Sequence, residues 1–126
     1  MMNKVKPIFR IFDYKKAIEY YIDFLGFTID WENKGDDGKA PVYMQVSRGD
    51  VTLHLSEHHG DASPGSNIFV EMKDVMEYNK ELLGKNYKYN KPGVDKMPWN
   101  TLEMKVHDPF GNRISFNQYL DSRNED

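Results

Sequence analysis

Residues 102–117 carry the pattern of a β-hairpin, with alternating apolar and polar side chains on both sides of a turn. Pro109 supplies the φ of an early turn position, Gly111 can adopt a positive φ, and the Asp108 carboxylate can accept from backbone N–H groups two residues on. The apolar side chains that alternate along the two arms are Leu102, Met104, Val106, Ile114 and Phe116. One face of this hairpin is expected to pack against the core, which leaves the other face available for a ligand or for chemistry.

The first half of the chain predicts one helix and four strands. Apolar side chains recur at helical spacing over residues 14–25, between Asp13, whose carboxylate can cap the first turn, and Gly26, which suits the position after the last turn. A tight connection at residues 48–50 separates two alternating runs and predicts another hairpin. The strands are expected at residues 4–11, 27–33, 41–47 and 51–57, with Pro7 placing the first of them at a sheet edge.

The second half predicts the same order of elements after a polar linker at residues 58–66 that is rich in glycine and proline. Asp74 is expected to cap its helix, which ends at Gly84. The remaining expected elements are a strand at 67–72, a short strand at 87–89, a loop at 91–100, the hairpin, and a charged, disordered tail at 121–126. The chain thus repeats a strand-helix-strand-strand-strand module of about 55 residues, which predicts an α+β fold whose curled sheets enclose a cleft.

Composition excludes several classes of protein. The chain has 126 residues, a length that suits one domain, and a net charge of −3, which argues against tracking a nucleic-acid backbone. The sequence has no cysteine, so it offers no disulfide and no thiol nucleophile, and it fits the reducing cytoplasm that we expect as its location. We find no apolar signal segment and no run approaching the roughly 20 apolar residues of a membrane span.

Three segments resemble the vicinal oxygen chelate superfamily, which includes glyoxalase I, extradiol dioxygenases, fosfomycin-resistance enzymes and bleomycin-resistance proteins. They are the helix at residues 17–27, the hairpin at 48–55 and the Asp-Pro-Phe-Gly-Asn turn at 108–112. The Pro-Trp-Asn segment at 98–100 is most similar to the bleomycin-resistance branch. The resemblance implies one domain over residues 1–120, built of two βαβββ modules at about 4–58 and 67–118, with the charged tail after it.

The same resemblance implies a homodimer with ligand grooves at its interface and with possible exchange of the first strand. Enzymes of the superfamily usually bind a divalent metal through His, Glu or Gln side chains. The matching positions in this chain hold Lys6, Asn67 and Ser115, so only His54 could be a ligand, and one imidazole is too few. We therefore expect no metal, no cofactor and no catalytic residue, and we interpret His54 as a hydrogen-bonded residue that faces the cleft.

The same resemblance implies that several aromatic side chains form the ligand site. They are joined by His54 and by two acids that would attract a cationic, planar ligand. Trp31 and Phe69 could equally be core residues, whereas Trp99, in a proline-containing loop, is better explained by ligand contact. The expected ligand-binding residues are Trp99, Tyr43, Phe69, Trp31, Asp30, His54 and Glu71.

These observations predict a metal-free protein that binds a small molecule, such as a bleomycin-type antibiotic, in a dimer-interface groove. A metal-dependent lyase, transferase or dioxygenase of the same fold is the alternative. A third interpretation is a structural or regulatory dimer whose cleft has lost its function. Neither nucleic acid nor a membrane is an expected partner.

Overall fold

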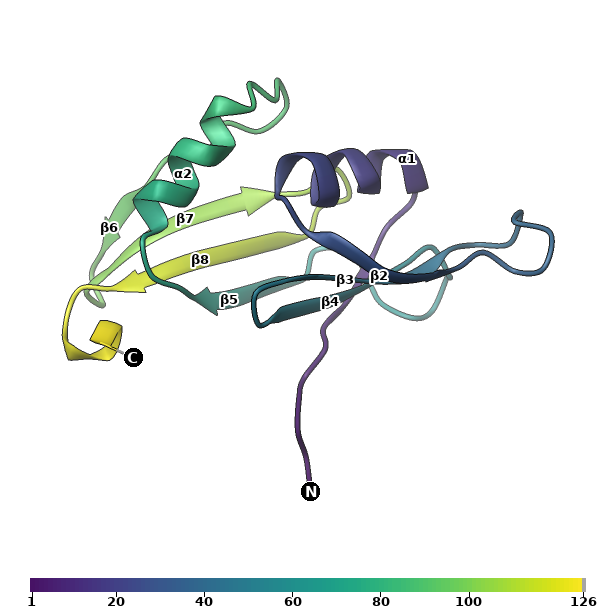
Figure 1. Ribbon diagram of the computed structural model, residues 1–126, viewed down its shortest axis with the longest axis horizontal. Helices are drawn as coiled ribbons and strands as arrows, with labels where there is room; N and C mark the ends of the chain where they lie inside the picture. The colour runs from purple at the N-terminus through teal and green to yellow at the C-terminus, as the bar shows by residue number, and fades with distance from the viewer. Residues whose placement is uncertain (126) are drawn as a thin grey trace. The chain divides into compact units, whose positions relative to one another are not determined.

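The computed structural model describes residues 1–125 and divides the chain into two compact units (Figure 1). Unit 1 contains Met1–Ser66 and the turn Pro109–Asn112, and unit 2 contains Asn67–Asp108 and the chain from Arg113 on. Each unit has a four-stranded sheet and a helix, so the predicted α+β fold class and the repeated order of elements are confirmed. Across the described residues, every helix is too short or too polar to cross a bilayer.

Unit 1 has the strand order β1-β4-β3-β2, in which β1 pairs parallel to β4 and the other neighbours are antiparallel. Strand β1 is therefore an edge strand, as the sequence predicts. Residues Met1, Met2 and Val5 precede it in an extended, exposed arm (Figure 1). The elements are β1 (Ile8–Arg10), α1 (Tyr14–Ala17), the π-helix η1 (Ile18–Phe24), β2 (Thr28–Asn33), β3 (Tyr43–Arg48) and β4 (Val51–Ser56).

The predicted helix of unit 1 begins and ends where the sequence indicates. The Asp13 carboxylate accepts a hydrogen bond from the Lys16 backbone N–H at 3.0 Å, and Gly26 has a φ of 82°. After one α-helical turn the helix becomes a π-helix. A π turn holds more residues than an α turn, so adjacent side chains diverge less in direction. This geometry suits the consecutive Tyr20 and Tyr21, which are both buried with their ring centroids 5.2 Å apart.

The sheet of unit 1 buries one face, which α1 and η1 cover (Figure 1). In the ladder between β3 and β4, Met44 pairs with Leu55 and Val46 pairs with Leu53, and all four side chains are fully buried. Because successive side chains of a strand point to opposite faces, the residues between them lie on the other face of the sheet, which we call the open face.

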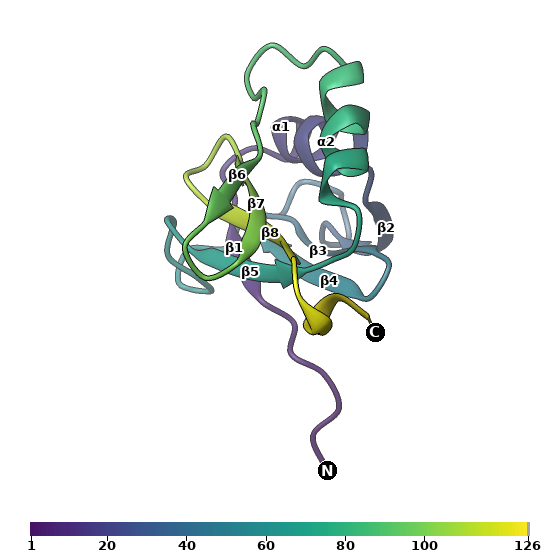
Figure 2. The same cartoon turned by 90° about the vertical axis from the view of Figure 1, so that its left-hand side faces the viewer.

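Unit 2 has the strand order β5-β8-β7-β6, with β5 parallel to β8. Helix α2 lies against β7 and β8 (Figure 2). The Tyr78 ring of α2 meets the Phe116 ring of β8 edge-on, with 5.1 Å between the ring centroids. The elements are β5 (Asn67–Glu71), α2 (Val75–Gly84), β6 (Asp95–Met97), β7 (Thr101–His107), β8 (Arg113–Tyr119) and the 3-10 helix η2 (Ser122–Glu125). The predicted hairpin is confirmed as β7 and β8, and Gly111 in its turn has a φ of 92°.

The prediction of a short strand at 87–89 is wrong, because the second strand of this module is β6, inside the loop predicted at 91–100. A turn explains its position: the Asn100 N–H donates to the Met97 carbonyl at 3.1 Å, and Asn100 has a φ of 66°. This three-residue connection joins β6 to β7 as a hairpin. Residues 87–89 instead form a turn after α2, in which the rings of Tyr87 and Tyr89 pack against each other at 5.5 Å.

The predicted cap of α2 is also wrong. Asp74 precedes the helix but has a left-handed backbone, with a φ of 55°, and its side chain makes no capping bond. The side-chain carbonyl of Gln118 accepts from the Val75 N–H at 3.0 Å instead, so strand β8 provides the cap. The tail that the sequence predicts to be disordered forms η2, and Asp126 lies outside the described residues.

The two helix starts can be compared by mutation. We expect Asp13→Ala to lower the free energy of unfolding by about 1 kcal/mol, because it removes the side chain that accepts from the Lys16 N–H in the first helical turn. Asp74→Gly is the control, because Gly favours the positive φ of this position and the Asp74 side chain makes no capping bond that could be lost. Urea unfolding followed by circular dichroism measures both; equal losses would contradict the assignment of the caps.

Candidate functional site

Three side chains on the open face of the unit 1 sheet form an aromatic cluster, and they come from three neighbouring strands. The rings of Trp31 and Tyr43 are nearly parallel, at 9° and 5.9 Å between centroids. The His54 ring meets Trp31 edge-on at 5.4 Å and Tyr43 edge-on at 5.1 Å. The indole of Trp31 is 43% exposed, so this cluster presents aromatic surface outside the core.

A β-bulge in β2 places Trp31 on this face. Ile29 pairs with Val46, on the buried side, whereas Trp31 pairs with Gln45, on the open side, and the register shifts between them. The intervening Asp30 is the extra residue of the bulge, and its carboxylate also lies on the open face. Regular alternation would have put Trp31 on the same side as Ile29. Because the bulge turns Trp31 to the open face, where it is partly exposed, the alternative that Trp31 is a core residue is wrong.

Hydrogen bonds fix the cluster to the sheet. The Tyr43 hydroxyl lies 2.6 Å from Nδ1 of His54, and Nε2 of His54 lies 3.1 Å from the side-chain oxygen of Gln45. The Gln45 amide nitrogen donates to Asp30 at 2.9 Å, and the Ser47 hydroxyl donates to the other Asp30 oxygen at 2.9 Å. Gln45 and Ser47 are not among the predicted site residues, although both follow Tyr43 at the two-residue spacing of one strand face.

The network also assigns the tautomer of His54. The side-chain oxygen of Gln45 is only an acceptor, so Nε2 of His54 carries the proton and Nδ1 accepts from the Tyr43 hydroxyl. Burial and the nearby Lys6 ammonium lower the pKa of His54, which favours this neutral form. Burial, with a contribution from Asp61, raises the pKa of Tyr43, so the phenol keeps its proton.

The other predicted site residues belong to unit 2. Phe69 is 50% exposed and contacts the Tyr119 ring at 6.4 Å, and the guanidinium of Arg123 lies 4.0 Å over Tyr119. Glu71 contributes to the field that raises the pKa of Arg123, after the larger effect of Asp121. Trp99 occupies the tip of the β6–β7 hairpin and is 49% exposed. None of these three predicted residues is a buried core residue.

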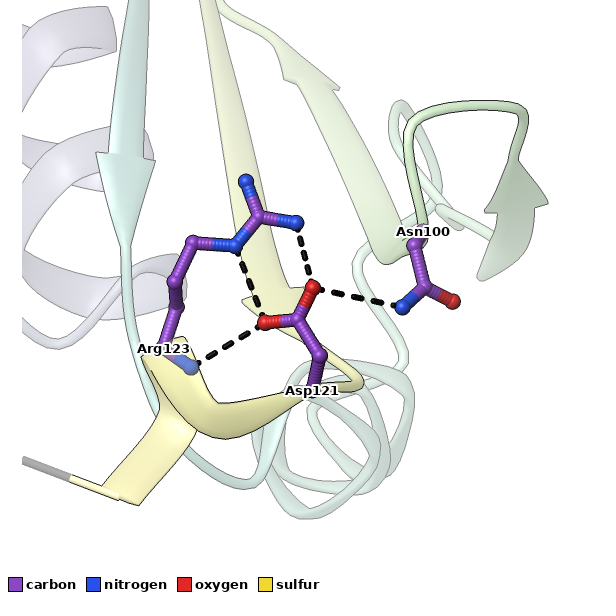
Figure 3. Close-up of polar contacts among 3 residues, drawn as sticks. All are labelled: Asn100, Asp121 and Arg123. Carbon is purple, nitrogen blue, oxygen red and sulfur yellow. Dashed lines mark hydrogen bonds and ion pairs between the residues drawn. The ribbon is translucent and has the colours of Figure 1, made fainter.

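The contacts of Arg123 were not predicted, because this residue lies in the tail that the sequence predicts to be disordered. Nε and Nη2 of Arg123 donate to the two Asp121 oxygens at 2.9 and 2.6 Å, and the Asn100 amide donates to the same carboxylate at 3.4 Å (Figure 3). These bonds lower the pKa of Asp121. The bidentate pair orients the Arg123 side chain, whose guanidinium lies over the ring of Tyr119.

The residues at the superfamily's metal-ligand positions do not fit a divalent metal. Within unit 1, Lys6 is a cation that donates to the Gln45 side chain at 3.1 Å, and both ring nitrogens of His54 have hydrogen-bond partners. Within unit 2, the Ser115 hydroxyl donates to the Asn67 side chain at 3.2 Å, and both are neutral. In the part of the chain that the structure describes, no three His, Asp or Glu side chains converge as ligands would.

The electrostatics of His54 can be tested by titration. We expect Lys6→Gln to raise the pKa of His54, because it removes the nearby positive charge. Lys4→Gln, in the same N-terminal arm, is the control of equal charge and should leave that pKa in place. The pKa is measured from the pH dependence of the histidine ring resonances by NMR, and no difference between the two variants would contradict the predicted role of Lys6.

The sign of the stability effect follows from the lowered pKa. The unfolded chain binds a proton at His54 more readily than the folded protein does, so the contribution of His54 to stability is complete above the unfolded pKa. It is lost as the pH falls through the folded pKa.

Comparisons with known proteins identify the family and the fold. The family model described as "Glyoxalase superfamily protein" matches residues 1–123. No curated protein matches the sequence significantly. Among solved structures, a bleomycin resistance determinant encoded on the transposon Tn5 has a TM-score of 0.74 at 18% identity, with 95% of this chain and 100% of that chain covered.

Two further solved structures are similar over nearly their whole length. A bleomycin-binding protein complexed with bleomycin has a TM-score of 0.72 at 18% identity, with 93% of this chain and 98% of that chain covered. TnmS3, an antibiotic binding protein from Streptomyces sp. CB03234, has a TM-score of 0.67 at 24% identity, with 94% and 98% covered. At these identities the structures establish a shared fold, while the family model covers nearly all of the chain. The protein therefore belongs to the glyoxalase superfamily.

Proposed function

We propose that the protein is a metal-free, cytoplasmic binding protein that captures a planar small molecule, such as a bleomycin-type antibiotic, without catalysis. The observation that carries the proposal is the aromatic cluster of Trp31, Tyr43 and His54 on the open face of the unit 1 sheet. Structural relatives named for bleomycin and antibiotic binding support the choice of ligand.

The cluster is suited to binding because its rings are already ordered. Tyr43 is fixed by its bond to His54, and Trp31 packs against both rings. A ligand that stacks on Trp31 therefore costs the protein little conformational entropy. The remaining exposed surface of the indole offers an aromatic face for a ring or a cation.

Charge beside the cluster favours a cationic ligand. Asp30 directly precedes Trp31 in the sequence. Gln45 and Ser47 each donate one hydrogen bond to the Asp30 carboxylate, one to each oxygen. A carboxylate oxygen has a second lone pair, so Asp30 can accept from a ligand as well. The chain's net charge of −3 adds a weaker, general attraction for cations.

We propose that Phe69, Glu71 and Trp99 of unit 2 also contact the ligand, in grooves of a homodimer whose protomers can exchange their first strands. The exposure of Phe69 and Trp99 supports this role, because large aromatic side chains on the surface commonly mark interaction sites. The edge position of β1 and the exposed Met1, Met2 and Val5 before it support the dimer.

Calorimetric titration with bleomycin tests the binding site. We expect Trp31→Ala and Trp99→Ala each to weaken the affinity about tenfold, because a stacked ring contributes about 0.5–1.5 kcal/mol beyond its buried area. Both side chains are nearly half exposed, so each variant should lose less stability than the about 3–5 kcal/mol of a truncated core aromatic.

The matched control is Tyr89→Ala, which removes a ring that is 70% exposed and lies outside the proposed site. The affinity of this variant for bleomycin should equal that of the wild type. The proposal fails if the wild-type protein gives no saturable binding, or if all three variants bind equally. A Trp99→Ala variant that loses stability but binds normally when folded would remove Trp99 from the site.

The proposed dimer is tested by light scattering on the purified protein at micromolar concentration. We expect the mass of two chains, because pairing or exchange at β1 would cover the edge strand and the apolar arm before it. A mass of one chain under these conditions would contradict the dimer and leave the binding site of unit 1 to be tested separately.

A further inference from the structure

A second surface of unit 1 has a pocket lined by two cationic side chains, Arg10 and Lys39. The pocket has a volume of about 280 Å³ and lies where the end of β1, the loop before β3 and the residue after β4 meet. Its lining residues are Arg10, Phe12, Lys39, Ala40, Pro41 and Glu57. None of these belongs to the aromatic cluster, so the pocket is a distinct feature of the unit.

The guanidinium of Arg10 is held in place by the backbone around the pocket. Its Nη1 donates to the carbonyl oxygens of Ile11 at 2.7 Å and of Glu57 at 2.6 Å. Its central carbon lies 4.5 Å over the ring of Phe12, which in turn packs against Phe110 at 6.2 Å. Within residues 1–125, Nε and Nη2 of Arg10 have no hydrogen-bond partner, so a fixed guanidinium keeps donors available for a ligand.

Lys39 adds a second cation from the loop between β2 and β3. The backbone of this loop is ordered by the Asp37 carboxylate, which accepts from the Lys39 N–H at 2.9 Å, and by a bond from Ala40 to Lys34 at 3.0 Å. The Lys39 ammonium forms no hydrogen bond or ion pair with any other described residue. The side chain is therefore free to turn toward an anion in the pocket.

Glu57 limits the charge of the ligand. One oxygen of its carboxylate accepts from the Val42 N–H at 2.9 Å, which fixes the group at the pocket wall. Two cations and one anion leave the lining with a net charge of +1, so a monoanion is matched better than a dianion. Apolar surface completes the wall, since Phe12 is 56% exposed and Pro41 is also exposed.

We propose that this pocket binds a small, planar aromatic carboxylate. Its carboxylate would accept from the free edge of the Arg10 guanidinium and from Lys39, as planar forks of donors favour carboxylates. Its ring would lie against Phe12 and Pro41. This inference concerns a site separate from the aromatic cluster and does not depend on the proposed antibiotic binding.

Benzoate is the probe for the test, with the full-length protein labelled with ¹⁵N for NMR. We expect saturable shifts at the amides of Phe12, Lys39, Ala40 and Glu57, with a dissociation constant of about 1 mM for so small a ligand. Lys39→Gln should weaken the affinity at least about fivefold, because it removes one of the two cations. The spectrum of each variant also reports whether it is folded.

Two controls separate this site from general charge and from apolar contact. Lys73→Gln removes one exposed positive charge in unit 2 and should leave benzoate binding unchanged. Benzyl alcohol has the ring without the charge and should produce no saturable shift at the same amides. The proposal is overturned if benzoate does not saturate, if the two lysine variants lose affinity equally, or if benzyl alcohol binds as benzoate does.

Discussion

The open face of unit 1 depends on the register between β3 and β4. Met44 pairs with Leu55 and Val46 with Leu53, and the burial of these side chains under the helix fixes the pairing. A slip of one residue would turn every side chain to the opposite face and bury polar groups. The same constraint that forms the core therefore presents Tyr43 and His54, with the polar residues between them, on the other side of the sheet.

The β-bulge in β2 explains why part of the site could be predicted from the sequence and part could not. The alternation along β3 and β4 is visible in the sequence, so the shared face of Tyr43 and His54 follows from it. Along β2, the alternation of apolar and polar side chains groups Trp31 with Phe27 and Ile29. The sequence therefore could not decide whether Trp31 is a core residue or a ligand-binding residue. A bulge depends on the partner strand and has no reliable local signal, so only the structure assigns Trp31 to the open face.

The errors in unit 2 have a similar origin. The order of strands and helix follows from local patterns, and so does the β7–β8 hairpin. The position of β6 instead depends on the turn at Met97–Asn100, and the cap of α2 comes from Gln118, distant in the sequence. Asp121 likewise has a partner from a distant hairpin, because the Asn100 amide donates to the carboxylate that pairs locally with Arg123 (Figure 3). Local propensity cannot reveal a partner that folding supplies from another strand.

The state of His54 connects the polar network to the proposed binding role. An imidazole that acts as a metal ligand needs a bare nitrogen directed at the metal, and a general base needs one directed at the substrate. In this protein the Tyr43 hydroxyl donates to Nδ1, the proton on Nε2 is donated to Gln45, and burial together with the nearby Lys6 lowers the pKa of His54, which disfavours the charged form. Each nitrogen thus has a structural partner, and the ring packs against Trp31 in a T-shaped pair. The hydrogen bonds orient His54 as part of a rigid aromatic surface, which is the property that stacking a planar ligand requires.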